Sequence, residues 1–283
     1  MKYANMHLHS TFSDGGFTPR QLVLIAKALG YKALALTDHE TNGGVKELAA
    51  AAAVEGLESI PGVEFYGDGW GINFHITALD FDNDDPGFNA FIKERCELYT
   101  EYTRKCVERA LRLGLIHDVT WNDVLDSCEE GMWICVDQVF DLLEKKKIVP
   151  REGGPASAAL RKEMFRSPEA HAMYPVMPTV DKVISVIRKA GGIAAVAHPS
   201  KAQSAYVGKL VELGMNGIEI SHPDLSMEET KLAEQAAQTY KLYHCGGTDH
   251  TGALSCCGGY LAIEALQGVT EEEFRILRGR KLG

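Results

Sequence analysis

Residues 18–39 read TPRQLVLIAKALGYKALALTDH, and this stretch contains a complete helix followed by a strand. Thr18 is a helix-capping residue and Pro19 occupies the first helical position, a combination that marks a helix start. The apolar run at 32–37 predicts a strand, and His39 follows it directly. A metal-competent side chain directly after a buried strand is typical of the functional edge of a β/α fold.

The same alternation of strand and helix extends in both directions from this unit, and it predicts an α/β fold built on a parallel sheet or barrel. A helical stretch with no clear strand interrupts the alternation from about residue 86 to 178, which predicts an inserted helical domain. We therefore expect a barrel formed by 1–85 and 179–283 and a substrate-selecting insertion at 86–178. The predicted strands are 3–9, 32–37, 57–64, 72–78, 193–197, 217–221, 242–246 and 260–265.

The composition of the 283 residues is that of a globular protein, with 45% hydrophobic and 24% charged residues. No apolar run approaches the roughly 18 to 20 residues of a membrane span. The first ten residues include two histidines where a secretion signal needs an apolar stretch, so we expect a cytoplasmic protein without a membrane partner.

The net charge and the cysteine spacing exclude several classes of ligand and structural site. The net charge of −10 disfavours long nucleic acid, because affinity for a phosphate backbone comes largely from Lys and Arg. The seven cysteines lack paired CxxC spacing, which argues against a disulfide framework and a structural zinc knuckle. A metal cluster would still make one pocket locally positive, so small phosphorylated ligands remain compatible with the acidic chain.

Histidines and carboxylates recur near the ends of the predicted strands. His7 and His9 are two residues apart on the first strand, so both imidazoles project from one face and reach one ion. Mixed imidazole and carboxylate ligands suit Mn, Zn or Fe better than Ca or Mg, which prefer oxygen alone. The further metal-competent residues at successive strands are His39, Glu64, His75, His198 and Asp249.

The order and spacing of these residues resemble the PHP family, named after its polymerase and histidinol phosphatase members. The resemblance implies a distorted seven-stranded, TIM-like β/α barrel that binds two or three divalent metal ions at its C-terminal face. It also implies that Glu64 bridges metal ions and acts in catalysis with His198 and Asp249. The motifs that carry it are His7-x-His9-Ser10, Ser13-Asp14-Gly15, Thr37-Asp38-His39, Gly62-x-Glu64, His75, Ala197-His198-Pro199 and Asp249; the implied ligands are His7, His9, Asp14, His39, Glu64, His75, His198 and Asp249.

One motif departs from the family pattern. Asp249 and His250 are adjacent, where the family commonly has Asp-x-His. Neighbouring side chains on an extended strand face opposite sides, so both reach one site only if the backbone turns after Asp249. Gly246, Gly247 and Gly252 permit such a turn, and we expect Asp249 to be a ligand and His250 to reach the cluster through the bend.

The insertion resembles the helical domain of stand-alone PHP members that act on nucleotides and other small phosphates. The likeness is loose, because 135–140 lacks the arginine of those relatives and 198–201 reads His-Pro-Ser-Lys instead of His-Pro-Gly-Arg. We expect Lys201 to bind substrate phosphate, with Arg161 and His222 as further substrate-binding residues.

These observations predict a phosphoesterase that hydrolyses a small ester, such as a nucleotide, a sugar phosphate or a cyclic phosphate. Metal ions would activate a water molecule and neutralise charge on the phosphate oxygens. Two alternatives stay open: a nuclease that trims short oligonucleotides, and a non-catalytic PHP module with metal bound. The sequence leaves the oligomeric state undetermined.

Overall fold

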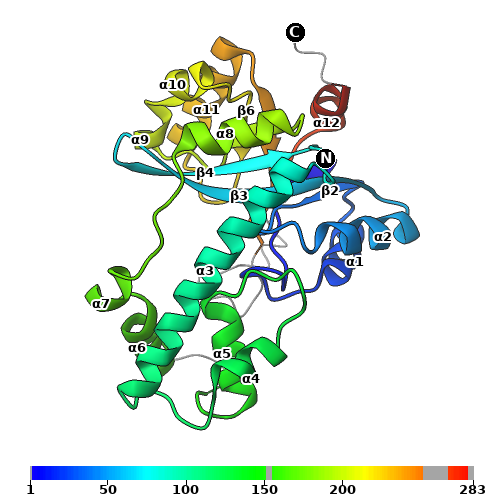
Figure 1. The fold of residues 1–283 in the computed structure, drawn as a ribbon. Helices are drawn as coiled ribbons and strands as arrows, with labels where there is room; N and C mark the ends of the chain where they lie inside the picture. Colours follow the sequence, from blue (N-terminus) through cyan, green and yellow to red (C-terminus); the bar gives the residue numbers. More distant parts are fainter. Residues whose placement is uncertain (1, 151–154, 251–266, 280–283) are drawn as a thin grey trace.

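The structure is a computed structural model that describes residues 2–150, 155–250 and 267–279. Its centre is a seven-stranded, nearly closed barrel in which the strands follow one another in chain order. Helices cover the outside, and a separate helical group extends from one end (Figure 1). The strands are β1 (Ala4–Asn5), β2 (Ala33–Leu36), β3 (Glu58–Gly69), β4 (Ile72–Leu79), β5 (Ile193–Val196), β6 (Gly217–Ser221) and β7 (Tyr243–Gly246).

Capping signals in the sequence predicted the helix starts well. Thr18 caps the first helix in a capping box with Gln21, and Ser226 caps a later helix in the same way. The helices are α1 (Pro19–Ala28), α2 (Val45–Glu55), α3 (Pro86–Arg112), α4 (Trp121–Asp126), α5 (Val136–Lys145), α6 (Pro155–Phe165), α7 (Pro168–His171), α8 (Val180–Lys189), α9 (Lys201–Ser204), α10 (Val207–Glu212), α11 (Met227–Tyr240) and α12 (Glu271–Gly279).

β4 corrects the expectation of a parallel sheet, because it runs antiparallel to both β3 and β5. The cause is a two-residue turn in which Trp70 and Gly71 have φ values of 54° and 74°. Two central residues with positive φ form the hairpin turn that joins neighbouring antiparallel strands. The remaining strand pairs in the barrel are parallel.

The two ends of the sheet meet beside the first histidines. β1 is shorter than expected, and the chain continues past it with a bridge between Leu8 and His250. The amide of Asp249 donates to the carbonyl of His7, and the amide of His9 donates to the carbonyl of His250. The first and last strands are thereby joined at the histidines. The predicted strand at 260–265 lies outside the described residues.

α3 contributes to two hydrophobic cores. Phe88, Phe91 and Ile92 pack with the strands and α8, whereas Val107 and Ala110 pack with the helices of the insertion. Figure 1 shows α3 running from the sheet to the helical group that contains α4 to α7. Among the helices described, none combines the length and apolar character needed to cross a bilayer.

Short contacts dock the helical group on the loops of the barrel. The backbone amide of Trp133 donates to the carbonyl of Phe12 at 2.8 Å. The hydroxyl of Thr41 donates to the carbonyl of Gly131 at 2.6 Å. The backbones also approach closely at Gly43, where an added Cβ would lie 2.6 Å from the Gly131 carbonyl oxygen. The segment around Gly131 and Trp133 therefore lies directly against the barrel loops.

Candidate metal centre

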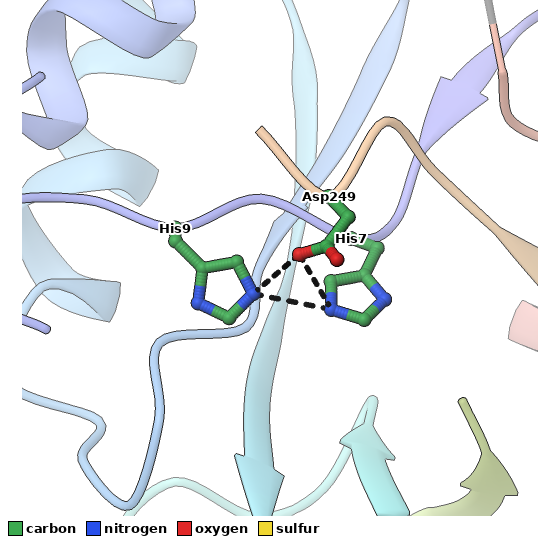
Figure 2. Close-up of side chains that lie close together, drawn as sticks. All are labelled: His7, His9 and Asp249. Atoms are coloured by element: carbon green, nitrogen blue, oxygen red, sulfur yellow. Dashed lines mark hydrogen bonds and ion pairs between the residues drawn. The ribbon is translucent and has the colours of Figure 1, made fainter. Parts of the chain in front are cut away.

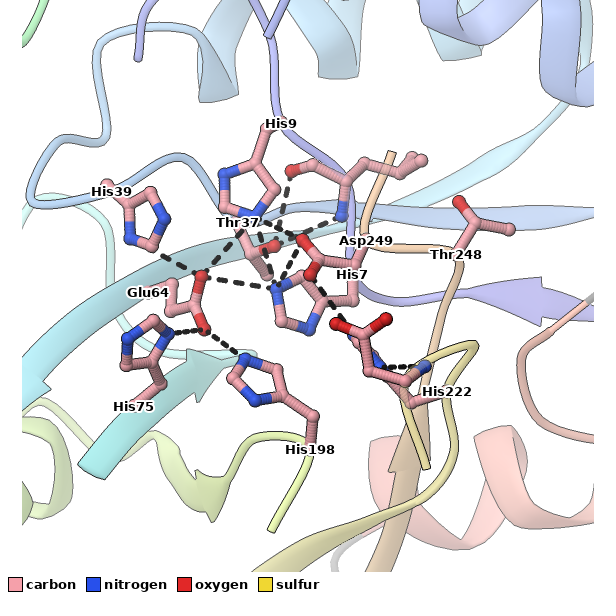
Figure 3. Close-up of polar contacts among 12 residues, drawn as sticks. His7, His9, Thr37, His39, Glu64, His75, His198, His222, Thr248 and Asp249 are labelled. Carbon is pink, nitrogen blue, oxygen red and sulfur yellow. Dashed lines mark hydrogen bonds and ion pairs between the residues drawn. The ribbon is translucent and has the colours of Figure 1, made fainter. Parts of the chain in front are cut away.

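The carboxylate of Glu64, on β3, lies at the centre of a buried cluster of histidines (Figure 3). Its side chain is 1% exposed. Five imidazoles surround it, each with a ring nitrogen within 3.4 Å of a carboxylate oxygen: His7 at 3.2 Å, His9 at 3.3 Å, His39 at 3.4 Å, His75 at 2.9 Å and His198 at 3.3 Å. One carboxylate shared by this many metal-binding groups has the arrangement expected of a bridging ligand.

His7, His9 and Asp249 form one compact group at the junction of the sheet ends (Figure 2). The Nε2 atoms of the two imidazoles are 3.2 Å apart. Oδ1 of Asp249 lies 3.0 Å from Nε2 of His9 and 3.5 Å from Nε2 of His7. Asp249 has a φ of 47°, so the backbone does turn at this residue.

Asp14 reaches the cluster from the loop that follows His9. Its Oδ1 lies 3.3 Å from Nδ1 of His9, and its Oδ2 lies 3.9 Å from Nε2 of His39. The loop is folded tightly, because an added Cβ on Gly15 would lie 2.3 Å from the carbonyl oxygen of His9. Buried Asp38 holds the same loop by accepting hydrogen bonds from the Ser10 amide and from the hydroxyls of Ser10 and Ser13.

The orientation of β4 explains how His75 joins the site. In parallel strands the carboxyl-terminal ends share one face of a barrel, so the site was expected at the end of each strand. β4 runs in the opposite direction and contributes His75 from its first half, opposite Tyr66 on β3. The structure brings His75 to the cluster, although the direction of its strand differs from the prediction.

Glu219 on β6 belongs to the site and was missed from the sequence. It is fully buried, one oxygen lies 2.7 Å from Nδ1 of His7, and the other accepts the backbone amide of His198 at 2.7 Å. A carboxylate on the outer nitrogen of a histidine fixes the ring and its tautomer for metal binding. The sequence signal was a carboxylate between Ile218 and Ile220 in a strand buried along its first half.

Of the three predicted substrate-binding residues, one lies at the metal cluster and two lie elsewhere in the structure. His222 is buried, with Nε2 at 3.2 Å from Oδ2 of Asp249. Lys201 is 69% exposed and pairs with Glu228 on α11. Arg161 pairs with Asp137 inside the insertion.

His250 is buried, but the structure brings it into none of the metal-competent groups formed by the described residues. Its ring stacks on Phe17 with centroids 5.4 Å apart. The bend at Asp249 is therefore present, whereas the expected approach of His250 to the cluster is not seen.

The charges of the cluster depend strongly on one another. Burial would lower the pKa of His7, but Glu219 and Glu64 outweigh this effect and hold the pKa well above its usual value. Burial would raise the pKa of Glu64, yet His7, His39 and His75 keep it well below its usual value. Burial dominates at His39 and lowers its pKa to about 4, so this ring is neutral at pH 7 and its lone pair is available to a metal ion.

The donor set fits a multinuclear metal centre. Of the described residues, the imidazoles of His9, His39 and His222 each have a buried ring nitrogen that lies close to a carboxylate oxygen but lacks hydrogen-bond geometry. Burying unpaired polar atoms is costly, and metal coordination offsets that cost. Five overlapping groups place three ligand atoms within 4.8 Å of one another: His7 with His9 and Asp249, His7 with Glu219 and His222, His7 with Glu64 and His198, His9 with His39 and Glu64, and His198 with His222 and Asp249.

Comparison with known proteins gives the same picture. The family model described as PHP domain matches residues 5–145. A 5'-3' exoribonuclease of Haemophilus influenzae is 28% identical over 88% of this chain and 89% of its own length. A phosphoribosyl 1,2-cyclic phosphate 1,2-diphosphodiesterase of Eggerthella lenta is 26% identical over 88% of this chain and 94% of its own. A 3',5'-nucleoside bisphosphate phosphatase of Chromobacterium violaceum is 26% identical, with 88% and 87% covered.

The fold is also similar to a solved structure. A protein from Bifidobacterium adolescentis, assigned as a metal-dependent phosphoesterase, superposes with a TM-score of 0.79 at 25% identity. The alignment covers 99% of this chain and 96% of that protein. The similarity therefore includes the insertion as well as the barrel.

Proposed function

Because the chain belongs to the PHP family of metal-dependent phosphoesterases, we propose that it hydrolyses a small phosphate ester, namely a nucleotide, a sugar phosphate or a cyclic phosphate. The observation that carries the proposal is the carboxylate of Glu64 among five imidazoles. The cyclic phosphodiesterase and the bisphosphate phosphatase, which each align over most of their length, support small substrates.

We assign two or three divalent ions, Mn, Zn or Fe, to this cluster. Their proposed ligands are the residues that surround Glu64 or pair with its neighbours: His7, His9, Asp14, His39, Glu64, His75, His198 and Asp249. Ions bound there would lower the pKa of a coordinated water to near neutrality and neutralise charge on the phosphate oxygens. The imidazole and carboxylate mixture favours these transition metals over Ca and Mg.

Three residues of the cluster are proposed to act directly: Glu64 in metal binding, and Asp249 and His198 at the partly exposed part of the site. Glu64 is almost fully buried, so we assign it the role of holding the metal ions in place. Asp249 is 24% exposed and has His222 at 3.2 Å from its second oxygen. That oxygen is suited to accept a proton from the attacking water, with the imidazole of His222 next to it. His198, 20% exposed, also faces the open side of the cluster.

The insertion is proposed to form a wall of the substrate site and to select the leaving group. Trp133, docked on the barrel loops, has its ring 5.6 Å from that of His39. The insertion therefore places the side chain of Trp133 in contact range of His39, a proposed metal ligand. Ligands to the metal recognise phosphate alone, so discrimination between esters must come from such walls.

Trimming of short oligonucleotides is the second candidate, favoured by the similarity to the exoribonuclease of Haemophilus influenzae. The net charge of −10 disfavours a long RNA but permits a short one. Both candidates use the same cluster and differ only in the groups beyond the scissile phosphate.

A panel of phosphate esters and short oligonucleotides, assayed with added Mn, tests the proposal. We expect phosphate release from small esters, and its loss in Glu64→Gln together with a lower metal content. Glu97→Gln is the matched control, because Glu97 is a surface residue of α3 with its side chain 67% exposed. Full metal content and turnover in Glu64→Gln would contradict the assigned role, and cleavage of oligonucleotides alone would favour the second candidate.

A further inference from the structure

An aromatic cavity of about 390 Å³ lies beside the metal cluster, between β3, α3 and the insertion. Its volume is in the range of small-molecule sites in proteins. The polar side chains of Thr103, Arg166 and His171 contribute to the lining. Its six Tyr, Trp and Phe rings come from segments far apart in the sequence: Tyr66, Tyr99, Tyr102, Trp133, Phe165 and Tyr174. None of these residues was singled out in the sequence.

Tyr66 lies between the cavity and the proposed metal site. The ring of Tyr66 stacks on that of His39 with centroids 4.7 Å apart and an angle of 13°. It meets the ring of His75 edge-on at 4.8 Å. On its other side it approaches Tyr99 at 5.7 Å. One tyrosine ring therefore separates the proposed metal ligands from the cavity.

Tyr99 and Trp133 form a small core cluster against which Tyr66 and Tyr174 pack, and the same four rings line the cavity. Tyr99 meets Trp133 at 85° and Tyr174 at 67°, both with centroids 5.6 Å apart. Edge-to-face rings that line a cavity offer aromatic surface against which a flat ligand can pack. The indole Nε1 of Trp133, a residue 8% exposed, has no hydrogen-bond partner among the described residues. A buried donor without a partner is costly, so a ligand with an acceptor nitrogen or oxygen would stabilise it.

We propose that this cavity binds the nucleobase of a nucleotide whose phosphate lies at the metal cluster. The inference rests on the proposed function and narrows its substrate class from phosphate esters in general to nucleotides. A nucleobase supplies both a flat face for the rings and acceptor atoms for the indole N–H. A sugar phosphate lacks the planar aromatic ring of a nucleobase and its ring-nitrogen acceptors.

The chemical test compares adenosine 5'-monophosphate with ribose 5-phosphate, which differ by the base alone. We expect kcat/KM to be higher for the nucleotide by roughly tenfold or more, the size of one base-stacking interaction. Tyr174→Leu, at the half-buried side of the cavity, should lower kcat/KM for the nucleotide and leave that for ribose 5-phosphate nearly unchanged. Trp133→Phe, which keeps a ring but removes the N–H, should act in the same direction.

Trp70→Leu is the matched control, because Trp70 is a half-exposed ring that stacks on Tyr206 away from the cavity. Its ratio of nucleotide to sugar phosphate turnover should equal that of the wild type. Equal kcat/KM for both substrates in the wild type, or an equal loss of both in Tyr174→Leu, would overturn the inference and leave the proposed function intact.

A binding measurement is independent of turnover. In Trp70→Phe/Trp121→Phe the remaining tryptophan is Trp133, and its fluorescence should change on addition of adenosine 5'-monophosphate but not of ribose 5-phosphate. If this change occurs while the wild type hydrolyses neither compound, the cavity assignment stands and the proposed hydrolysis is wrong. If the nucleotide leaves the Trp133 signal unchanged, the cavity assignment is wrong.

Discussion

Nδ1 of His7 lies 2.7 Å from a carboxylate oxygen of Glu219, and both side chains are fully buried. The second oxygen of Glu219 accepts the amide of His198. His198 has a φ of 28°, a backbone conformation that side chains rarely adopt and that needs support from neighbours. Glu219 therefore positions two of the proposed ligands at once.

Replacing Glu219 by Gln should weaken metal binding by about 10- to 100-fold, the usual effect of losing a carboxylate behind a metal-binding histidine. The amide has one acceptor oxygen, so it no longer serves both His7 and His198. Titration with Mn measures the change, and Glu97→Gln on the surface should bind like the wild type. An unchanged affinity in Glu219→Gln would mean that His7 is oriented by other contacts.

Asp249→Ala and His250→Ala separate two neighbours that the sequence left ambiguous. Asp249 contacts His7, His9 and His222, so its loss should reduce both metal content and turnover. The ring of His250 stacks on Phe17, so its replacement should mainly lower stability. Elemental analysis and thermal unfolding of the two variants distinguish the roles. Metal loss in His250→Ala without loss of stability would restore His250 as a ligand.

Exchanging the insertion with that of a nucleotide-specific relative should shift the substrate profile toward that relative. The exchange should retain Phe88, Phe91 and Ile92, because these residues of α3 belong to the core of the barrel. A chimera cut at residue 86 would lose this packing and confound specificity with stability. A folded chimera with an unchanged profile on the ester panel would show that the barrel loops select the substrate.

Acid stability should depend on Glu273 in α12. Its hydrogen bond with His244 is the main cause that lowers its pKa to about 2 from 4.5. A depressed carboxyl pKa stabilises the fold above pH 4.5, and this stabilisation is lost as the pH falls toward 2. Glu273→Gln should therefore lower the free energy of unfolding by at most about 1 kcal/mol at neutral pH, with a difference that disappears in acid.

Chemical unfolding of wild type and Glu273→Gln across this pH range measures the effect, since the acid sensitivity of the metal cluster is common to both. Glu272→Gln, on the exposed side of the same helix, is the control. A difference that grows as the pH falls would contradict the assigned pKa shift.

Local signals predicted much of the fold because they act over a few residues. The start of α1 was predicted from Thr18 and Pro19. The direction of β4 was not predicted, because the turn at Trp70 and Gly71 was not used as a hairpin signal. The predicted strands at 57–64 and 72–78 leave only residues 65–71 between them, which is too short for a parallel crossover, so this signal was available.

Site residues were predicted where their type is unusual and missed where it is ordinary. A histidine directly after a buried strand is conspicuous, and His39 and His198 were found in this way. A single carboxylate between two isoleucines has the pattern of a strand with one face in water, so Glu219 was overlooked. Lys201 was chosen because it follows His198 closely, but nearness in sequence does not give the direction of a long side chain.

The joining of the two sheet ends at His7 and Asp249 gives a bound ion a further physical role. An ion held by both residues is a cross-link that closes a loop spanning most of the chain. The entropy lost in closing a loop grows only with the logarithm of its length, by about 0.6 kcal/mol for each doubling. A single coordination event therefore joins residues near the two ends of the polypeptide, and because the site is absent from the unfolded chain, the ion would stabilise the fold by binding the folded state alone.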